Sequence, residues 1–260
     1  MCVIAYAEHV RPTKDMIEAM YKANEYGAGI AWRESGGVSW AKGLSVEEAM
    51  ELSEQVPFPF AMHFRLPSAG TSERLEACHP FPLSDDVELA LAGSTPGSVL
   101  FHNGMWNNWR EKLIDYAVKS GKKLPANSWS DSRGLAWVAH HFGLGALELL
   151  DQRVLVFGPE TVEIFGTSGK VNGWSLMDVP KSDAKIWVSN THWVRSGNYY
   201  LDPPASMAGG HHQKQIANGQ AGGTALTPFR GAAGVDQDAG EWGGEQETVQ
   251  ETNEAYCGLG

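Results

Sequence analysis

The chain opens with Met1-Cys2-Val3-Ile4-Ala5-Tyr6-Ala7, and the rest of the sequence is interpreted outward from this stretch. Residues 2–7 form a short apolar run that predicts a buried strand. Removal of the initiator methionine would leave Cys2 with a free α-amine, so that one residue holds both a thiol nucleophile and a base. An α-amine has an ordinary pKa of roughly 7.7–8.0, which suits a base at neutral pH. Taken alone, a cysteine at this position is more often a small buried strand residue, so other residues must decide.

The composition is that of a globular protein with an uneven charge. The chain has 260 residues, of which 42% are hydrophobic and 20% charged, enough to bury a core without disulfide bonds. The net charge of -11 argues against a general binder of nucleic acids or anionic membranes. Past Arg230 the sequence has seven acidic residues and no Lys or Arg, so the acidity is mostly a property of the tail.

The cysteines and the hydropathy pattern bear on location. Cys2, Cys78 and Cys257 form neither a CxxC pair nor a disulfide framework, so we expect a reducing compartment, the cytoplasm. No apolar run approaches 18 residues, so no membrane-spanning segment is predicted. The first residues lack the basic and apolar pattern of a secretory signal, and Cys2 is therefore expected at the start of the mature chain.

The order of predicted elements indicates one α+β domain over residues 1–200. Helices are expected after Thr13, after the capping box of Ser45 and Glu48, and after Ser130 or Asp131. Residues 87–92 and 99–102 are predicted to pair as strands around the turn at 94–97. Residues 201–260 are rich in Gly, Ala, Gln and Glu, which predicts a mostly disordered acidic tail.

Four further residues, at three places in the chain, are candidates for binding or catalysis. Asn103 and Gly104 follow an apolar strand, where an amide and a backbone N–H could form an oxyanion hole, although Asn-Gly is also a common turn. Arg65 ends a strand and could pair with a substrate carboxylate or take part in a structural salt bridge. Asp131 could accept hydrogen bonds from a substrate ammonium or simply cap a helix.

These pieces occur in an order that resembles the class II glutamine amidotransferase domain of the N-terminal nucleophile hydrolase superfamily. The resemblance covers about residues 2–190. The matching stretches are Met1-Cys2-Val3-Ile4, Gly27-Ala28-Gly29-Ile30-Ala31, the segment from His63 to Gly70, His79-Pro80-Phe81, Phe101-His102-Asn103-Gly104 and Ser130-Asp131-Ser132. The resemblance implies a four-layer αββα sandwich.

The resemblance also implies a role for each candidate residue. Cys2 would be the nucleophile with its α-amine as base, and Asn103 and Gly104 would form the oxyanion hole. The substrate would be glutamine, its α-carboxylate held by Arg65 and its α-ammonium by Asp131, with the hydroxyl of Ser68 nearby. The products would be glutamate and ammonia, the latter passed to a separate synthase. No metal and no cofactor is expected.

The sequence departs from the family pattern at Leu66-Pro67, Ala69 and Ser132-Arg133, near the expected substrate site. Two alternatives therefore stay open: an N-terminal-cysteine acylase acting on another amide, and a catalytically inactive binding or scaffold member of the fold. The adjacent His140 and His141 are expected to face different directions on a helix, so they predict no metal site.

Overall fold

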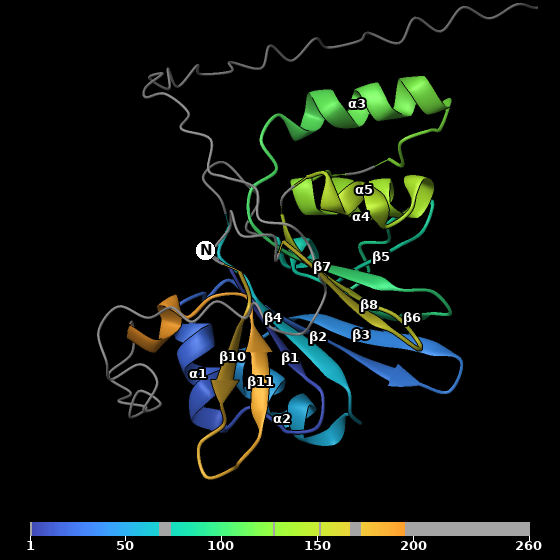
Figure 1. Ribbon diagram of the computed structural model, residues 1–260. Coiled ribbons are helices and arrows are strands. Elements are labelled where there is room, and N and C mark those ends of the chain that lie inside the picture. The colour runs from blue at the N-terminus through green and yellow to red at the C-terminus, as the bar shows by residue number, and fades with distance from the viewer. Residues whose placement is uncertain (1, 68–73, 127, 151, 167–172, 196–260) are drawn as a thin grey trace, which may run out of the picture. The chain divides into compact units, whose positions relative to one another are not determined.

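The computed structural model describes residues 2–67, 74–126, 128–150, 152–166 and 173–195. Two antiparallel sheets form its centre (Figure 1). The larger sheet has the strand order β10-β11-β1-β4-β2-β3-β6. Its strands are β1 (Val3–Ala7), β2 (Ala28–Glu34), β3 (Gly37–Leu44), β4 (Phe60–Phe64), β6 (Ala92–Thr95), β10 (Ser175–Asp178) and β11 (Lys185–Val188).

The smaller sheet and the helices complete the described part of the chain. The smaller sheet has the order β5-β7-β8-β9, with β5 (Phe81–Pro82), β7 (Val99–Asn103), β8 (Arg153–Phe157) and β9 (Val162–Phe165). The helices are α1 (Lys14–Lys22), α2 (Val46–Gln55), α3 (Trp109–Ser120), α4 (Asp131–Phe142) and the short α5 (Gly145–Glu148). There are also two 3₁₀ helices in the described residues: η1 (Leu75–Ala77), between β4 and β5, and η2 (His192–Arg195), after β11.

Three hydrophobic clusters stack these elements into four layers. One cluster joins the larger sheet to α1 and α2, a second lies between the two sheets, and a third joins the smaller sheet to α3 and α4. Strand β1 shows why: Val3 and Ala5 face the helices, whereas Ile4 and Tyr6 face the other sheet. A strand covered on both faces needs a continuous apolar run, which residues 3–7 supply. The predicted αββα sandwich is confirmed.

The helix starts follow the capping signals of the sequence. The hydroxyl of Thr13 accepts a hydrogen bond from the N–H of Met16, and Ser45 forms a capping box with Glu48. The cap of α4 is Ser130, whose hydroxyl accepts from the N–H of Arg133. Asp131 is therefore the first helical residue, and its carboxylate is not used as the cap.

The predicted pairing of residues 87–92 with 99–102 is wrong. The two strands that flank the turn belong to different sheets: β6 pairs with β3, whereas β7 pairs with β5 and β8. Strand β6 pairs with β3 because the edge of β3 offers unpaired backbone groups. Val87 lies outside both sheets: it is buried, and its carbonyl accepts a hydrogen bond from the guanidinium of Arg133. The turn at 94–97 therefore leads the chain from one sheet to the other.

Some expectations concern parts of the chain that the structure does not describe. Ser68 and the predicted tail, residues 201–260, both lie outside the described residues. Strands β5 and β10 and helix α5 were not predicted, since each spans only two to four residues. Within the described ranges, no helix is long and apolar enough to cross a membrane.

Candidate active site

A pocket of about 300 Å³ lies beside the N-terminal end of β1. Its lining includes four of the predicted site residues, namely Cys2, Arg65, Gly104 and Asp131. They come from four separate places in the chain: the start of β1, the residue after β4, the residue after β7 and the first turn of α4. The two antiparallel sheets and α4 thus bring together residues that are up to 129 positions apart (131 − 2).

The thiol of Cys2 sits at the end of its strand against the backbone of Leu66. Its Sγ donates to the carbonyl of Leu66 and accepts from the N–H of the same residue, each at 3.3 Å. The side chain is half-buried and forms no disulfide. Arg65 directly precedes Leu66, so the backbone contact with Leu66 also brings Arg65 close to Cys2.

The electrostatic surroundings of Cys2 leave its thiol in need of a base. Burial raises the pKa of the Cys2 thiol above its ordinary value, although the hydrogen bond from Leu66 and the positive charge of Arg65 oppose this. A thiol with a raised pKa is protonated at neutral pH, whereas the thiolate is the reactive form. Any nucleophilic chemistry at this position therefore requires a proton acceptor close to the sulfur atom.

Two residues that the sequence analysis missed hold the Cys2 strand in place. Asn190 donates from Nδ2 to the carbonyl of Cys2 at 2.6 Å, and the hydroxyl of Ser189 accepts from the N–H of Ile4 at 2.8 Å. Ser189 also donates its own N–H to the carbonyl of Ile4 at 2.9 Å. Both residues directly follow β11, which pairs with β1. A polar Ser-Asn pair at the end of an apolar strand was the available signal.

The same serine contacts one of the predicted oxyanion-hole residues. Nδ2 of Asn103 donates to Oγ of Ser189 at 2.7 Å, so one of its two hydrogens is used and the second remains. Asn103 itself is buried and does not line the described pocket, whereas Gly104 does. A Cβ added at Gly104 would lie 2.5 Å from Oε1 of Gln152 and 3.0 Å from Nε2 of the buried His102, so a larger residue here requires a shift of the Gln152 side chain or of the backbone.

Arg65 and Asp131 supply opposite charges to the pocket. Arg65 is 6% exposed, and its NH1 contacts the carbonyl of Arg74 at 3.4 Å. One oxygen of Asp131 accepts from the N–H of Trp106 at 3.2 Å and the other from the N–H of Ser132 at 2.8 Å. The hydroxyl of Ser132 also donates to Oδ1 of Asp131 at 3.3 Å. A carboxylate offers about four lone-pair sites, so Asp131 keeps acceptor capacity for one further bond after these three.

Three buried histidines, His63, His79 and His102, lie behind the pocket, and His79 and His102 reach its lining. Nδ1 of His79 and Nε2 of His63 are 2.7 Å apart, so one ring donates to the other. Burial lowers the pKa of His63 to about 3 and that of His79 well below its ordinary value. Nδ1 of His102 hydrogen-bonds Oγ of Ser132 at 2.9 Å, which fits a supporting role beside Asp131.

The other cysteine in the described ranges, Cys78, is buried and does not line the pocket that contains Cys2. Cys78 follows η1, is completely buried, and its Sγ contacts the carbonyl of Tyr26 at 3.4 Å. Burial also raises the pKa of the Cys78 thiol. These features are those of a structural loop residue.

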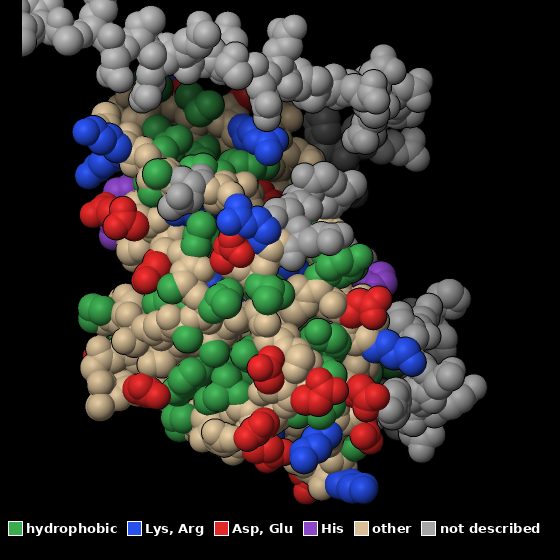
Figure 2. Space-filling model, turned by 180° about the vertical axis from the view of Figure 1, so that it is seen from behind, with side chains coloured by type: hydrophobic (Ala, Val, Ile, Leu, Met, Phe, Trp, Pro, Cys, Tyr) green, Lys and Arg blue, Asp and Glu red, His purple; other side chains and the backbone are tan. Residues whose placement is uncertain are grey.

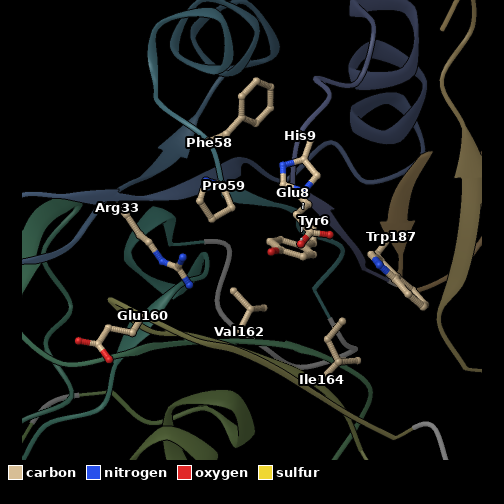
Figure 3. Close-up of a pocket in the computed structure, with 10 residues that line it drawn as sticks. All are labelled: Tyr6, Glu8, His9, Arg33, Phe58, Pro59, Glu160, Val162, Ile164 and Trp187. Atoms are coloured by element: carbon tan, nitrogen blue, oxygen red, sulfur yellow. Dashed lines mark ion pairs between the residues drawn. The ribbon is translucent and has the colours of Figure 1, made fainter. Parts of the chain in front are cut away.

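A second pocket, of about 530 Å³, lies at the opposite end of β1 (Figure 3). Tyr6 and Glu8 contribute from the end of β1 and the residues after it, and Val162 and Ile164 contribute from β9. In Figure 3 the guanidinium of Arg33 points toward the space between the sheets. None of the predicted site residues lines this pocket, so it carries no part of the proposed chemistry.

The fold is similar to that of solved structures that include the following two. One is the allosteric regulatory enzyme of purine biosynthesis, with a TM-score of 0.51 and 18% identity. The other is glutamine phosphoribosylpyrophosphate amidotransferase from B. subtilis in complex with ADP and GMP, with a TM-score of 0.50 and 17% identity. Each match covers 75% of this chain and 43% of the other, so the chain spans under half the length of either neighbour. No family model matches the sequence, and no curated protein does.

Glutamine phosphoribosylpyrophosphate amidotransferase is a class II glutamine amidotransferase of the N-terminal nucleophile type. The chain has the fold of this class. The resemblance drawn from the sequence motifs is thereby confirmed at the level of the fold. Identities of 17–18% extend the likeness to the fold alone, so the chemistry has to be argued from the residues of the pocket.

Proposed function

We propose that this protein hydrolyses glutamine to glutamate and ammonia through a thioester on Cys2. The observation that carries the proposal is the pocket itself, in which the thiol of Cys2 lies with a buried cation, Arg65, and an anion, Asp131. Free glutamine has an α-carboxylate and an α-ammonium that match these two charges. The side-chain amide of glutamine is then the group left to meet the thiol.

The α-amine that Met1 removal would expose on Cys2 supplies the base that the raised thiol pKa demands. It takes the proton of the thiol, and the thiolate attacks the amide carbon. When the carbon–nitrogen bond breaks, the amine returns that proton to the leaving nitrogen, and ammonia departs. Water then attacks the thioester, with the amine again as base, and releases glutamate and the thiol.

Gly104 and Asn103 are proposed to stabilise the tetrahedral oxyanion. Gly104 brings its backbone N–H to the pocket without a side chain, and Asn103 has one amide hydrogen beyond the bond to Ser189. One such donor is typically worth roughly 3–4 kcal/mol of transition-state stabilisation. Ser68, which lies outside the described residues, is proposed as a further hydroxyl near the substrate.

The wider setting is also part of the proposal. The ammonia would pass to a separate synthase. We place the reaction in the cytoplasm, because the thiol of Cys2 must stay reduced to act. In the described residues, Cys2 and Cys78 are both free thiols. Residues 1–200 would form the catalytic domain, and residues 201–260 an acidic, disordered tail.

The decisive experiment measures glutamate and ammonia release from glutamine by the purified full chain, with Met1 removal checked by intact mass. Cys2→Ala should lower the rate by at least about a thousandfold, because it removes the nucleophile. The matched control is Cys78→Ala, which removes a buried thiol outside the pocket and should keep the activity. Equal rates for Cys2→Ala and the unaltered protein, or no ammonia from protein that lacks Met1, would refute the proposal.

One observation favours a different amide as substrate. Asp131 already accepts two backbone hydrogen bonds, and the pocket lining includes the apolar side chains of Met105, Trp109 and Trp129. An N-terminal-cysteine acylase would bind an apolar acyl group against such a wall. Side-by-side assays of glutamine and a hydrophobic acyl-amide separate the two substrates. Arg65→Lys should raise KM for glutamine more than KM for the acyl-amide, since only glutamine presents an α-carboxylate to this residue.

A further inference from the structure

A cluster of metal-ligating side chains lies at the C-terminal end of α4. His140 and His141 are the last residues of this helix before Phe142, and Asp85 lies in the loop between β5 and β6. The ligand atoms of the three side chains lie within 4.8 Å of one another. The expectation that the two histidines face different directions is therefore wrong, because both ring Nε2 atoms approach the same carboxylate oxygen.

The distances between the ligand atoms of this cluster are close to those between two ligands of the same metal ion. Oδ1 of Asp85 lies 3.2 Å from Nε2 of His140 and 3.6 Å from Nε2 of His141. Two ligands at about 2.0–2.1 Å from a tetrahedral zinc ion lie roughly 3.3 Å from each other. Only small side-chain movements would bring all three atoms to coordination distance.

The backbone around the cluster is held in place by a buried charge. Arg133, 2% exposed and two helical turns before His140, donates from NH2 to the carbonyl of Asp86 at 2.7 Å and from Nε to that of Val87 at 2.9 Å. The loop that carries Asp85 is thus tied to the same helix as the histidines. The ring of His141 also packs edge-on against Trp137, with centroids 4.5 Å apart.

We propose that Asp85, His140 and His141 bind a divalent transition-metal ion such as zinc, with water in the remaining coordination positions. Two imidazoles and one carboxylate suit zinc, copper or nickel, whereas magnesium and calcium prefer oxygen ligands alone. None of the three residues lines the pocket that contains Cys2. The ion would tie the loop after β5 to α4, and it would take no part in amide hydrolysis.

The cluster is open to solvent on one side. The side chain of Asp85 is 83% exposed and that of His140 34%, whereas that of His141 is 7% exposed. Figure 2 shows histidine side chains beside acidic ones at both edges of the face it displays. An ion can therefore enter from solution without unfolding of the helix.

Zinc titration by calorimetry tests the proposal on the full chain. The background is Cys2→Ala, which removes the one half-buried thiol of the described residues that could compete for zinc. The test variant adds His140→Asn and His141→Asn, and the matched control adds His211→Asn and His212→Asn, the other adjacent pair in the sequence. The test variant should lose one zinc site per chain, and the control should keep it.

A second measurement guards against loss of folding, because His141 packs on Trp137. Asp85→Asn changes only an exposed side chain and should weaken zinc binding while the melting temperature in EDTA stays that of the background protein. Zinc should raise the melting temperature of the background protein and have less effect on Asp85→Asn. Unchanged zinc binding in the His140 and His141 variant, loss of the site in the control, or no binding to the background protein would each overturn the proposal.

Discussion

Acid is predicted to destabilise the fold through the buried histidines behind the Cys2 pocket. His63 is fully buried, and burial lowers its pKa from 6.5 to about 3, with further lowering by the charges of Arg65 and His102. His79, whose ring is hydrogen-bonded to His63, has its pKa lowered in the same direction. The neutral pair shares one proton between two nitrogens, and a second proton would place a cation between the two sheets.

The sign and size of the effect follow from linkage. Between pH 6.5 and about 3, the unfolded chain binds a proton at His63 that the folded chain excludes. Stability is therefore fully present above pH 6.5 and falls as the pH falls, by about 1.4 kcal/mol per pH unit for this one group. The loss reaches about 2 kcal/mol at pH 5, a large part of the about 5–15 kcal/mol that stabilises an ordinary domain.

Urea unfolding followed by tryptophan fluorescence measures this effect, because Trp40, Trp106, Trp137 and Trp193 are buried in the fold. The free energy of unfolding is measured at several values between pH 7 and 5 for the unaltered protein and for His63→Asn. The pH slope of the variant should be shallower by about 1.4 kcal/mol per unit, since the substituted residue cannot bind a proton. Carboxylates contribute to both proteins and cancel in the comparison.

Equal pH slopes for the two proteins would refute the reasoning. A second readout covers the case in which His63→Asn does not fold. The ring-proton resonance of His63 in the unaltered protein should not shift between pH 7 and 5, because the folded ring stays neutral over that range. A titration with a midpoint near 6.5 would show that the ring is solvated and that burial does not control it.

Two further predictions concern the proposed active site. Gly104→Ala places a Cβ 2.5 Å from Oε1 of Gln152 and 3.0 Å from Nε2 of His102, so glutaminase activity should fall about a hundredfold or more as the backbone N–H is displaced; activity near that of the unaltered protein would remove Gly104 from the oxyanion hole. Asn190→Ala removes the 2.6 Å bond to the carbonyl of Cys2, so kcat for glutamine should fall at least about tenfold with little change in KM, measured by steady-state kinetics. A change in KM alone would mean that Asn190 does not position the nucleophile.

Short sequence signals, such as helix caps and apolar runs, correctly predicted the starts of helices and the first strand. Thr13 and Ser45 have the hydroxyl and the following residues that make a helix start, and both caps are present in the structure. The apolar run of residues 2–7 predicted a short buried strand, and the structure shows that β1 is buried on both faces. The predicted pairing of residues 87–92 with 99–102 failed because β6 pairs with β3 instead. That pairing depends on residues more than 50 positions away, which no local signal reports.

The sequence predicted those residues of the candidate site whose side chains have a distinctive reactive or charged group. A thiol at position 2, a cation after a strand and an anion at a helix start are each visible in the sequence, and Cys2, Arg65 and Asp131 do line one pocket. Ser189 and Asn190 act through hydrogen bonds to the backbone of a strand that lies almost the whole described chain away. Such bonds have no spacing pattern, because any small polar residue at the end of β11 could make them.

The pairing of β1 with β11 ties the start of the chain to a strand that the ribosome makes much later. Cys2 leaves the ribosome first, but the side chain that holds its carbonyl, Asn190, is added 188 residues afterwards. A nascent chain that ends before this residue has the thiol without the hydrogen bonds that orient its strand. Synthesis itself would thus delay the onset of the proposed reactivity, because the thiol of Cys2 is oriented only once β11, the last strand of the described residues, has docked beside β1.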